Sequence, residues 1–282
     1  MTSASVQPIL ALLADPVGGN PTQYMVEKAF AHHGLDWRFV SFEVGPPALA
    51  DAIGGLRALG FAGAVCGEPH PVAVLPYLDQ LDEVAELIGA VNLLVRVDEG
   101  IRGENTQGAA FLEVLRPRLD PAGKRGFLLG AGHAARAAAV ELARAGIAEL
   151  AVSAPAENHA RDLADLLRNR CALAVEAVPW EGDLPIPDGL DLLVHATETG
   201  IHDETTALPL NLDRLTAETL VADLTADPPH TWLLRAAEER GCATLDGLDI
   251  YIAQAAMNFR RWTGVDPDRQ VLREAVEEFL EL

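Results

Sequence analysis

The stretch from Arg125 to Gly146 constrains the fold of this chain more than any other part of it. Arg125 to Leu129 is a short apolar run, which is typical of a buried parallel strand. It leads into the turn Gly130-Ala-Gly-His-Ala-Ala135, which reads G-x-G-x-x-A, and an alanine-rich helix follows and ends at Gly146. A strand, a glycine turn and a helix in this order are the context that a dinucleotide-binding fingerprint requires.

Each small residue of this turn has a physical task. Gly130 allows the tight turn, and Gly132 lets the backbone come close to a pyrophosphate. Ala135 lets the helix pack closely on the strand, and the anion would lie on free N–H groups at the helix N-terminus. The alternative is a glycine turn in an ordinary α/β sheet that binds no ligand.

Composition excludes several classes of partner. The chain of 282 residues has a net charge of -21, with 42 acidic and 21 basic residues, and such a surface repels nucleic acid and anionic membranes. The N-terminus has no basic region before its apolar run, so we expect no signal peptide, and no apolar run is long enough to span a bilayer. Cys66, Cys171 and Cys242 lie far apart, without metal-ligand spacing, which favours a reducing cytoplasm and predicts no metal site.

Strand and helix patterns alternate along the chain, which favours parallel sheets and an α/β fold. The predicted strands are 8–14, 37–44, 61–66, 90–97, 100–104, 125–129, 150–152, 173–178, 190–196 and 220–224. The predicted helices are 21–33, 47–59, 72–87, 108–115, 134–145, 158–169, 230–240, 249–263 and 268–282. A polar, proline-containing linker at 116–123 indicates two domains.

Four stretches carry a resemblance to the shikimate/quinate dehydrogenase family. They are Val74-Leu-Pro-Tyr-Leu through Ile88-Gly-Ala-Val-Asn92, then Gly103-Glu-Asn-Thr-Gln-Gly108, Gly130-Ala-Gly-His-Ala-Ala-Arg136, and Gly247-Leu-Asp-Ile-Tyr-Ile-Ala-Gln254 through Phe259-Arg-Arg-Trp-Thr-Gly264. The resemblance implies an α/β substrate domain, residues 1–107, and a Rossmann-type doubly wound parallel sheet that binds NAD or NADP, residues 108–248. Residues 249–282 would pack back on the first domain.

The resemblance also implies an activity, namely hydride transfer between a nicotinamide and a hydroxylated ring acid such as shikimate, quinate or a relative. The substrate is a small molecule that binds between the two domains, and the family contains both monomers and homodimers. Such a reaction needs a proton acceptor beside the ring hydroxyl. The family uses a Lys–Asp pair for this task.

This chain departs from the family at both members of that pair. The family lysine of N-V-T-x-P-x-K aligns with Pro71, and the family aspartate of N-T-D aligns with Gln107. Neither residue can take up a proton. His70 is the remaining titratable candidate near the lost lysine, with an unperturbed pKa that suits a general base. We therefore predict His70, and Gln107 at the aspartate position, as the catalytic candidates.

The other substrate positions are polar, and some of them differ from the family while others are kept. The two serines of the family's H-S-x-S-P loop align with hydrogen-bonding residues, and two family positions are kept. The predicted substrate-binding residues are Asn20, Thr22, Asn92, Gln107 and Gln254. Glu68, Asp227 and Asp249 would make the site acidic and hint at a substrate other than a plain carboxylate anion, unless they are solvated rim residues.

The dinucleotide site departs from the family as well. The N-R-T segment of NADP-using members, whose arginine pairs with the 2′-phosphate, aligns with Ser153-Ala-Pro155, and no aspartate for an NAD ribose is present. His195 replaces the asparagine of the family's I-N-A-T. The predicted dinucleotide-binding residues are Gly130, Gly132, His133, Ala134, Ser153, Thr197 and Gly247.

Three functions stay open at this point. The first is a divergent NAD(P)-dependent dehydrogenase of the shikimate/quinate type. The second is a catalytically impaired or inactive paralogue that binds a small molecule or a dinucleotide. The third is another reaction in the same cleft, with His70 or Glu68 as the base.

Overall fold

The computed structural model describes residues 6–98 and 100–282. Residues 1–5, within the N-terminal segment that we expect to hold no signal peptide, lie outside the described residues, as does Glu99. The chain divides into two compact units. Unit 1 comprises Met1–Thr106 and Gln254–Leu282, and unit 2 comprises Gln107–Ala253.

Unit 1 is built on a mixed sheet. Its strands are β1 (Ile9–Ala14), β2 (Arg38–Glu43), β3 (Gly63–Cys66), β4 (Gln80–Leu81), β5 (Leu93–Val97) and β6 (Gly100–Glu104). Their order is β2-β1-β3-β5-β6-β4, with β1 parallel to both β2 and β3, and β5 antiparallel to both β3 and β6. The strands β1 and β3 are apolar and buried, as sheets covered on both faces require.

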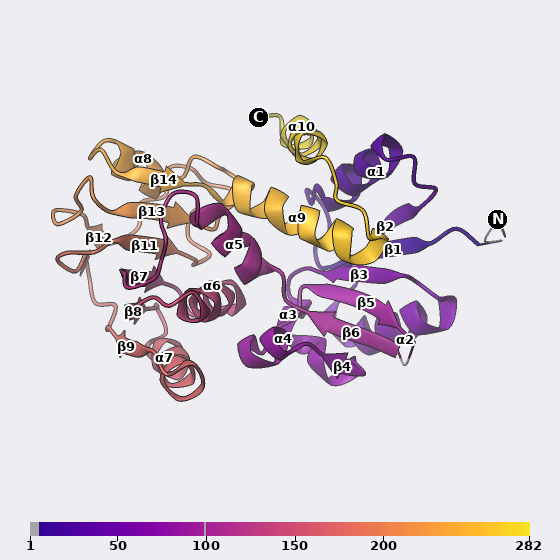
Figure 1. Ribbon diagram of the computed structural model, residues 1–282, viewed down its shortest axis with the longest axis horizontal. Coiled ribbons are helices and arrows are strands. Elements are labelled where there is room, and N and C mark those ends of the chain that lie inside the picture. The colour runs from indigo at the N-terminus through magenta and orange to yellow at the C-terminus, as the bar shows by residue number, and fades with distance from the viewer. Residues whose placement is uncertain (1–5, 99) are drawn as a thin grey trace. The chain divides into compact units, whose positions relative to one another are not determined.

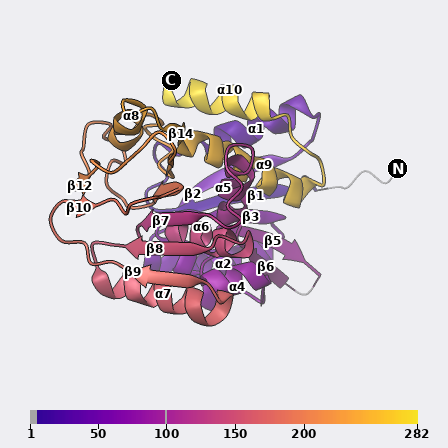
Figure 2. The same cartoon turned by 60° about the vertical axis from the view of Figure 1, so that its left-hand side comes forward.

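Helices cover this sheet. They are α1 (Thr22–His32), η1 (Pro46–Ala48), α2 (Leu49–Leu59), α3 (His70–Ala73), η2 (Leu75–Tyr77), α4 (Glu83–Ile88) and α10 (Arg269–Leu280), together with the second half of α9 (Gly247–Thr263). Figures 1 and 2 both show α10 beside α1, and the two helices are in contact. The C-terminal segment therefore returns to the first unit, as the resemblance implied.

The prediction of a single helix over residues 72–87 is wrong. The chain there forms α3, η2, the short strand β4 and then α4. Pro76 has no N–H to donate and restricts the residue before it, so a regular helix cannot continue through it. A new helix starts only where the Asp82 side chain accepts a hydrogen bond from the Ala85 N–H at 2.6 Å.

Unit 2 contains a fully parallel sheet. Its strands are β7 (Arg125–Leu129), β8 (Glu149–Ser153), β9 (Ala174–Ala177), β11 (Leu192–His195), β13 (Leu220–Asp223) and β14 (Ala243–Leu245), and a separate pair comprises β10 (Leu184–Pro185) and β12 (Leu210–Asn211). The order is β14-β13-β11-β7-β8-β9. Counted from β7, this is the doubly wound order of a Rossmann fold, which confirms the predicted α/β class.

Helices form three of the crossover connections of unit 2, namely those between β7 and β8, between β8 and β9 and between β13 and β14, and one further helix precedes β7. The helices are α5 (Gln107–Leu115), α6 (His133–Arg144), α7 (Glu157–Cys171) and α8 (Trp232–Glu238). In Figure 2, α7 runs along β9, which it contacts, and α6 packs on both β7 and α5. Among the described residues, no helix combines the length and apolarity needed to cross a membrane.

A close backbone approach fixes α9 on the sheet of unit 1. Trp262 Nε1 donates to the Leu94 carbonyl oxygen of β5 at 3.0 Å. A Cβ placed on Gly63 of β3 would lie 2.4 Å from both the Leu94 oxygen and Trp262 Nε1. Only glycine fits there, so the position of the tryptophan depends on the absence of a side chain at residue 63.

Two glycine substitutions test this packing. We expect Gly63→Ala to lower the free energy of unfolding by about 2–4 kcal/mol, because overpacking and loss of the indole hydrogen bond add. Gly54→Ala in the exposed face of α2 meets no atom within 4 Å and is the matched control, which should raise that free energy by about 0.5–1 kcal/mol. Urea unfolding measures both, and a neutral Gly63→Ala variant would contradict the packing described.

Candidate functional site

In unit 1, several polar residues gather at one edge of the sheet. Asn20 follows β1, His70 follows β3, Asn92 directly precedes β5 and Thr106 follows β6. Because β1 and β3 are parallel and β5 and β6 alternate in direction, all four positions fall at the same edge. Ligands bind preferentially at such edges of α/β sheets, beyond the carboxyl ends of the strands.

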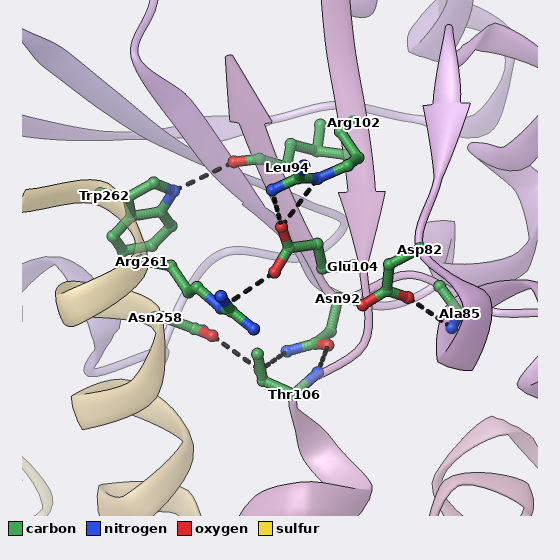
Figure 3. Close-up of polar contacts among 10 residues, drawn as sticks. All are labelled: Asp82, Ala85, Asn92, Leu94, Arg102, Glu104, Thr106, Asn258, Arg261 and Trp262. Carbon is green, nitrogen blue, oxygen red and sulfur yellow. Dashed lines mark hydrogen bonds and ion pairs between the residues drawn. The ribbon is translucent and has the colours of Figure 1, made fainter. Parts of the chain in front are cut away.

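Asn92 is held at this edge by a buried network. Its Nδ2 donates to Thr106 Oγ1 at 2.8 Å, and its Oδ1 accepts from the Thr106 backbone N–H at 2.8 Å. The Thr106 hydroxyl in turn donates to Asn258 Oδ1 of α9 at 2.7 Å (Figure 3). All three side chains are buried, so the amide of Asn92 has one fixed orientation, with one N–H and one oxygen lone pair still available to a ligand.

A second polar cluster lies beside this network. The Glu104 side chain is 3% exposed, and its Oε1 accepts from Arg102 Nη2 at 2.5 Å, while its Oε2 contacts Arg261 Nε at 3.1 Å. Figure 3 shows both guanidinium groups turned towards this carboxylate. Burial raises the pKa of the neighbouring Asp82, and the charge of Glu104 adds to the shift. The two arginines thus balance two carboxylates.

The other predicted substrate residues have local contacts of their own. Asn20 Oδ1 accepts from the Thr22 backbone N–H at 3.0 Å, so it also supports the start of α1. Thr22 is buried, and Gln254 is half-buried on α9. Gln107 is the first residue of α5 and follows directly on Thr106. The structure brings Asn20, Thr22 and Asn92 to one edge of unit 1, and their binding role stays a prediction.

The surroundings of His70 favour a structural role for it. The side chain is 0% exposed, and its Nε2 lies 2.6 Å from the Val44 carbonyl oxygen. A general base must come within hydrogen-bond reach of the proton that it removes, and a ring with no exposed surface is poorly placed for this. Pro71, at the family lysine position, is also buried and is the second residue of the short helix α3, which begins at His70.

The glycine turn of unit 2 has the geometry of an anion cradle. Gly130 has φ +122°, and a Cβ there would lie 2.3 Å from the Ala196 carbonyl oxygen. Gly132 is the N-cap of α6 with no side-chain cap, and a Cβ on it would meet no atom within 4 Å. Open space above an uncapped helix N-terminus fits a pyrophosphate group. Ala135 is fully buried against the strand, as expected.

The remaining dinucleotide candidates differ in their surroundings. His133 and Ala134 begin α6 and are half-buried, and Ser153, at the end of β8, is completely buried. A Cβ on Gly247 would lie 2.2 Å from the Thr225 carbonyl oxygen. Close packing of the α9 start on the chain after β13 is therefore sufficient to explain this glycine without a ligand.

Sequence reasoning missed a buried pair at the carboxyl ends of β11 and β13. His195 Nδ1 lies 3.0 Å from Asp223 Oδ2, with both side chains 1% exposed, and His195 Nε2 lies 2.6 Å from Thr197 Oγ1. The available signal was that two apolar strands each end in one polar residue. From the sequence, His195 stood out only as a replacement for asparagine, and Asp223 was not a candidate.

Two of the acidic residues considered for the site have basic side chains as contact partners. Asp227 binds His202 Nδ1 at 2.9 Å, and Asp249 lies 3.5 Å from Arg118 Nη2. These contacts favour the interpretation of both as solvated rim residues. Within residues 6–98 and 100–282, no group of three or more histidine, cysteine, aspartate or glutamate side chains is arranged to hold a metal ion.

Comparison with known families matches both ends of the chain. The family model for the shikimate dehydrogenase substrate binding domain matches residues 12–94. The model for the shikimate 5′-dehydrogenase C-terminal domain matches residues 247–277.

Individual relatives match over nearly the whole length. Shikimate dehydrogenase (NADP(+)) of Moorella thermoacetica is 39% identical over 95% of this chain and 93% of that protein. The ligand-free 5-ketofructose reductase of Gluconobacter sp. strain CHM43 is 39% identical, with a TM-score of 0.92 over 97% of this chain and 99% of that one. Shikimate 5-dehydrogenase of Listeria monocytogenes, in complex with shikimate and NAD, is 29% identical with a TM-score of 0.87, covering 97% and 98%.

Thr106 offers a test of the buried network. Thr106→Val should lower the free energy of unfolding by about 2–4 kcal/mol, because Asn92 Nδ2 and Asn258 Oδ1 both lose a buried partner. Thr106→Ser keeps the hydroxyl and is the control, with an expected loss of about 1 kcal/mol. Chemical denaturation measures both, and equal losses for the two variants would show that the hydroxyl contributes nothing.

Proposed function

The chain belongs to the shikimate dehydrogenase family, and on this premise we propose that it is an NAD(P)-dependent oxidoreductase that interconverts a secondary alcohol and a ketone. The proposed substrate is a hydroxylated ring acid of the shikimate or quinate type, or a relative. The observation that carries the proposal is the glycine turn after β7, whose open space at Gly132 leaves room for a dinucleotide pyrophosphate. Identity of 39% over 95% of the chain to a shikimate dehydrogenase supports it.

The residues present fit a nicotinamide dinucleotide. Gly130, Gly132, His133 and Ala134 would hold the pyrophosphate on the N-terminus of α6. Ser153 lies where the adenosine ribose is expected, and Thr197 follows β11 on the other side of the turn. When bound, a nicotinamide supplies the hydride acceptor or donor, and these residues orient it.

We assign NAD rather than NADP as the preferred dinucleotide. The segment after β8 reads Ser153-Ala-Pro-Ala-Glu157 and contains no cationic side chain to neutralise a 2′-phosphate. Glu157 itself is bound by Arg161, one turn later on α7. A dianionic phosphate at this place would meet an apolar and acidic surface.

This assignment predicts a ratio of affinities. NAD should bind at least about tenfold more tightly than NADP, and Pro155→Arg, at an exposed position, should narrow or reverse that ratio by adding a cation. Isothermal titration calorimetry with each dinucleotide measures it, with Pro155→Gln as the neutral control. Equal binding of both dinucleotides by the unsubstituted protein would disprove the assignment.

A neutral polyhydroxylated ketone is the second candidate substrate. The predicted substrate residues Asn20, Thr22 and Asn92 are uncharged, and Arg102 and Arg261 are both bound to Glu104. A carboxylate ligand gains most from a free cation, whereas sugar hydroxyls need only amide and hydroxyl partners. A relative named 5-ketofructose reductase, with 39% identity, is consistent with this alternative.

We further propose that the acid/base pair of the family is absent here. Pro71 and Gln107 hold the positions of the lysine and the aspartate in the alignment of the motifs. General acid–base catalysis contributes about 10²–10⁴ in rate, so shikimate turnover should be slow unless other residues of the chain take up the proton.

The double variant Pro71→Lys/Gln107→Asp tests both points. We expect it to raise kcat/KM for shikimate, by about 10²–10⁴-fold where no other group takes up the proton, with smaller gains for each single variant because the two groups act together. Dinucleotide reduction is followed by absorbance with shikimate and quinate, and dinucleotide oxidation with 5-ketofructose. If the unsubstituted protein converts none of these compounds, the proposed oxidoreductase function is wrong. If the double variant folds but gains no activity on shikimate, the proposed loss of the acid/base pair is wrong.

A further inference from the structure

Three polar side chains of unit 2 form a continuous chain at the carboxyl ends of β11 and β13. His195 and Asp223 occupy the same register position on these neighbouring parallel strands, which brings the two side chains together. Thr197 lies just beyond β11 and is half-buried. The distances are 3.0 Å between His195 Nδ1 and Asp223 Oδ2, and 2.6 Å between His195 Nε2 and Thr197 Oγ1.

The contacts of Asp223 determine which ring nitrogen carries a proton. Burial alone would raise the pKa of the Asp223 carboxyl, but hydrogen bonds from His195, from the Thr225 backbone N–H and from the Thr231 hydroxyl lower it overall. The carboxylate is ionised and can only accept. His195 Nδ1 is the ring nitrogen that faces this carboxylate, at 3.0 Å, so we assign the ring proton to Nδ1, which leaves Nε2 as an acceptor for the Thr197 hydroxyl.

Thr197 connects this buried pair to the glycine turn. The Ala196 backbone N–H donates to the Leu129 carbonyl oxygen at 2.7 Å, and a Cβ on Gly130 would lie 3.3 Å from the Thr197 nitrogen. The strand order reverses between β7 and β11, and dinucleotides bind across that point. A pyrophosphate at the turn after β7, with the adenosine towards β8, would direct the nicotinamide towards β11 on the other side of β7. Thr197, just beyond β11, lies on that side.

The Thr197 oxygen still has capacity for a ligand. It gives its proton to His195 Nε2 and accepts a hydrogen bond from the Thr199 backbone N–H at 3.2 Å. A hydroxyl oxygen has two lone pairs, so one remains to accept a proton from an incoming hydroxyl. The arrangement of aspartate, histidine and hydroxyl is the one by which serine hydrolases move a proton, recognised by geometry and role.

We propose that Thr197, His195 and Asp223 form a proton relay that takes up the hydroxyl proton of the substrate, in place of the lysine and aspartate that the chain lacks. The relay rests on the proposed oxidoreductase function. In the oxidation, the C–H and O–H bonds of the alcohol break and a C=O bond forms. The hydrogen of the C–H bond leaves with its electron pair to the nicotinamide, which is the two-electron oxidant of the proposed function.

The O–H proton passes to Thr197 Oγ1 while the Thr197 proton passes to His195 Nε2. The imidazolium that forms is stabilised by the Asp223 carboxylate, and the reduction runs through the same steps in reverse. On β7, the strand on the other side, the residue beside His195 is the apolar Leu129, so Asp223 is the charged partner that the register provides. An asparagine at position 195 could hold Thr197 but could not take the proton.

The variant His195→Asn tests the relay, because asparagine can hold Thr197 but cannot take up a proton. His195→Asn should lower kcat of the holoenzyme by about 10²–10⁴-fold, while the dissociation constant for NAD stays within about twofold. Its remaining kcat should rise about tenfold per pH unit, because hydroxide must then accept the proton.

Thr197→Val should lower kcat to a similar extent, and Thr197→Ser should keep most of the kcat of the unsubstituted protein. Thr219→Val is the control for destabilisation of unit 2, because Thr219 is buried and its hydroxyl donates to the Leu190 carbonyl oxygen.

A measurement without substrate or dinucleotide tests the relay independently. Nitrogen-15 NMR of the free protein should show a neutral His195 ring protonated at Nδ1, with the Nδ1–H resonance shifted in Asp223→Asn. A ring protonated at Nε2 would overturn the relay, whatever the activity. An active protein whose His195→Asn variant keeps its kcat and pH profile would overturn it as well. A protein that binds NAD but oxidises no alcohol contradicts the proposed function instead.

Discussion

Parallel pairing of strands is the constraint on which both candidate sites depend. It sends the carboxyl ends of β1 and β3 to one edge in unit 1, and those of β7, β11 and β13 to one edge in unit 2. The pairing also fixes which side chains become neighbours, because a slip of one residue would turn a strand's whole set of side chains to the other face. The pair of His195 and Asp223 exists only in the observed register.

The sequence predicted the features that local chemistry determines. The glycine turn at Gly130 and Gly132 was found because a tight turn, an open approach and an uncapped helix N-terminus each need a small residue at a fixed spacing. The longer strands were found, because short apolar runs separated by amphipathic helices have few other solutions than a parallel sheet, whereas the short strands β4, β10, β12 and β14 were missed. The same stretches were enough to indicate the family, which the comparisons confirmed.

Features that depend on tertiary register were not predictable in the same way. Asn258 looks like an ordinary polar residue of α9 until the fold places it against Thr106, and His195 gives no local sign of its aspartate partner. The segment 72–87 failed for the opposite reason, because its composition suits a helix while Pro76 and the Asp82 cap divide it. The roles of Asn20, Gln107 and Gln254 towards a ligand remain predictions of the family resemblance.

The discontinuity of unit 1 has a consequence for how the chain is made. Unit 2 is continuous in sequence, whereas unit 1 needs α10 and the second half of α9, which leave the ribosome after unit 2. Until Trp262 is synthesised, the Leu94 carbonyl and the space beside Gly63 lack the indole that fills them. Because domains generally fold as they emerge, the nascent chain completes its second unit before its first. A message truncated before Gln254 would therefore encode all of unit 2 but only an unfinished unit 1, whose exposed apolar surface marks it for chaperones and proteases.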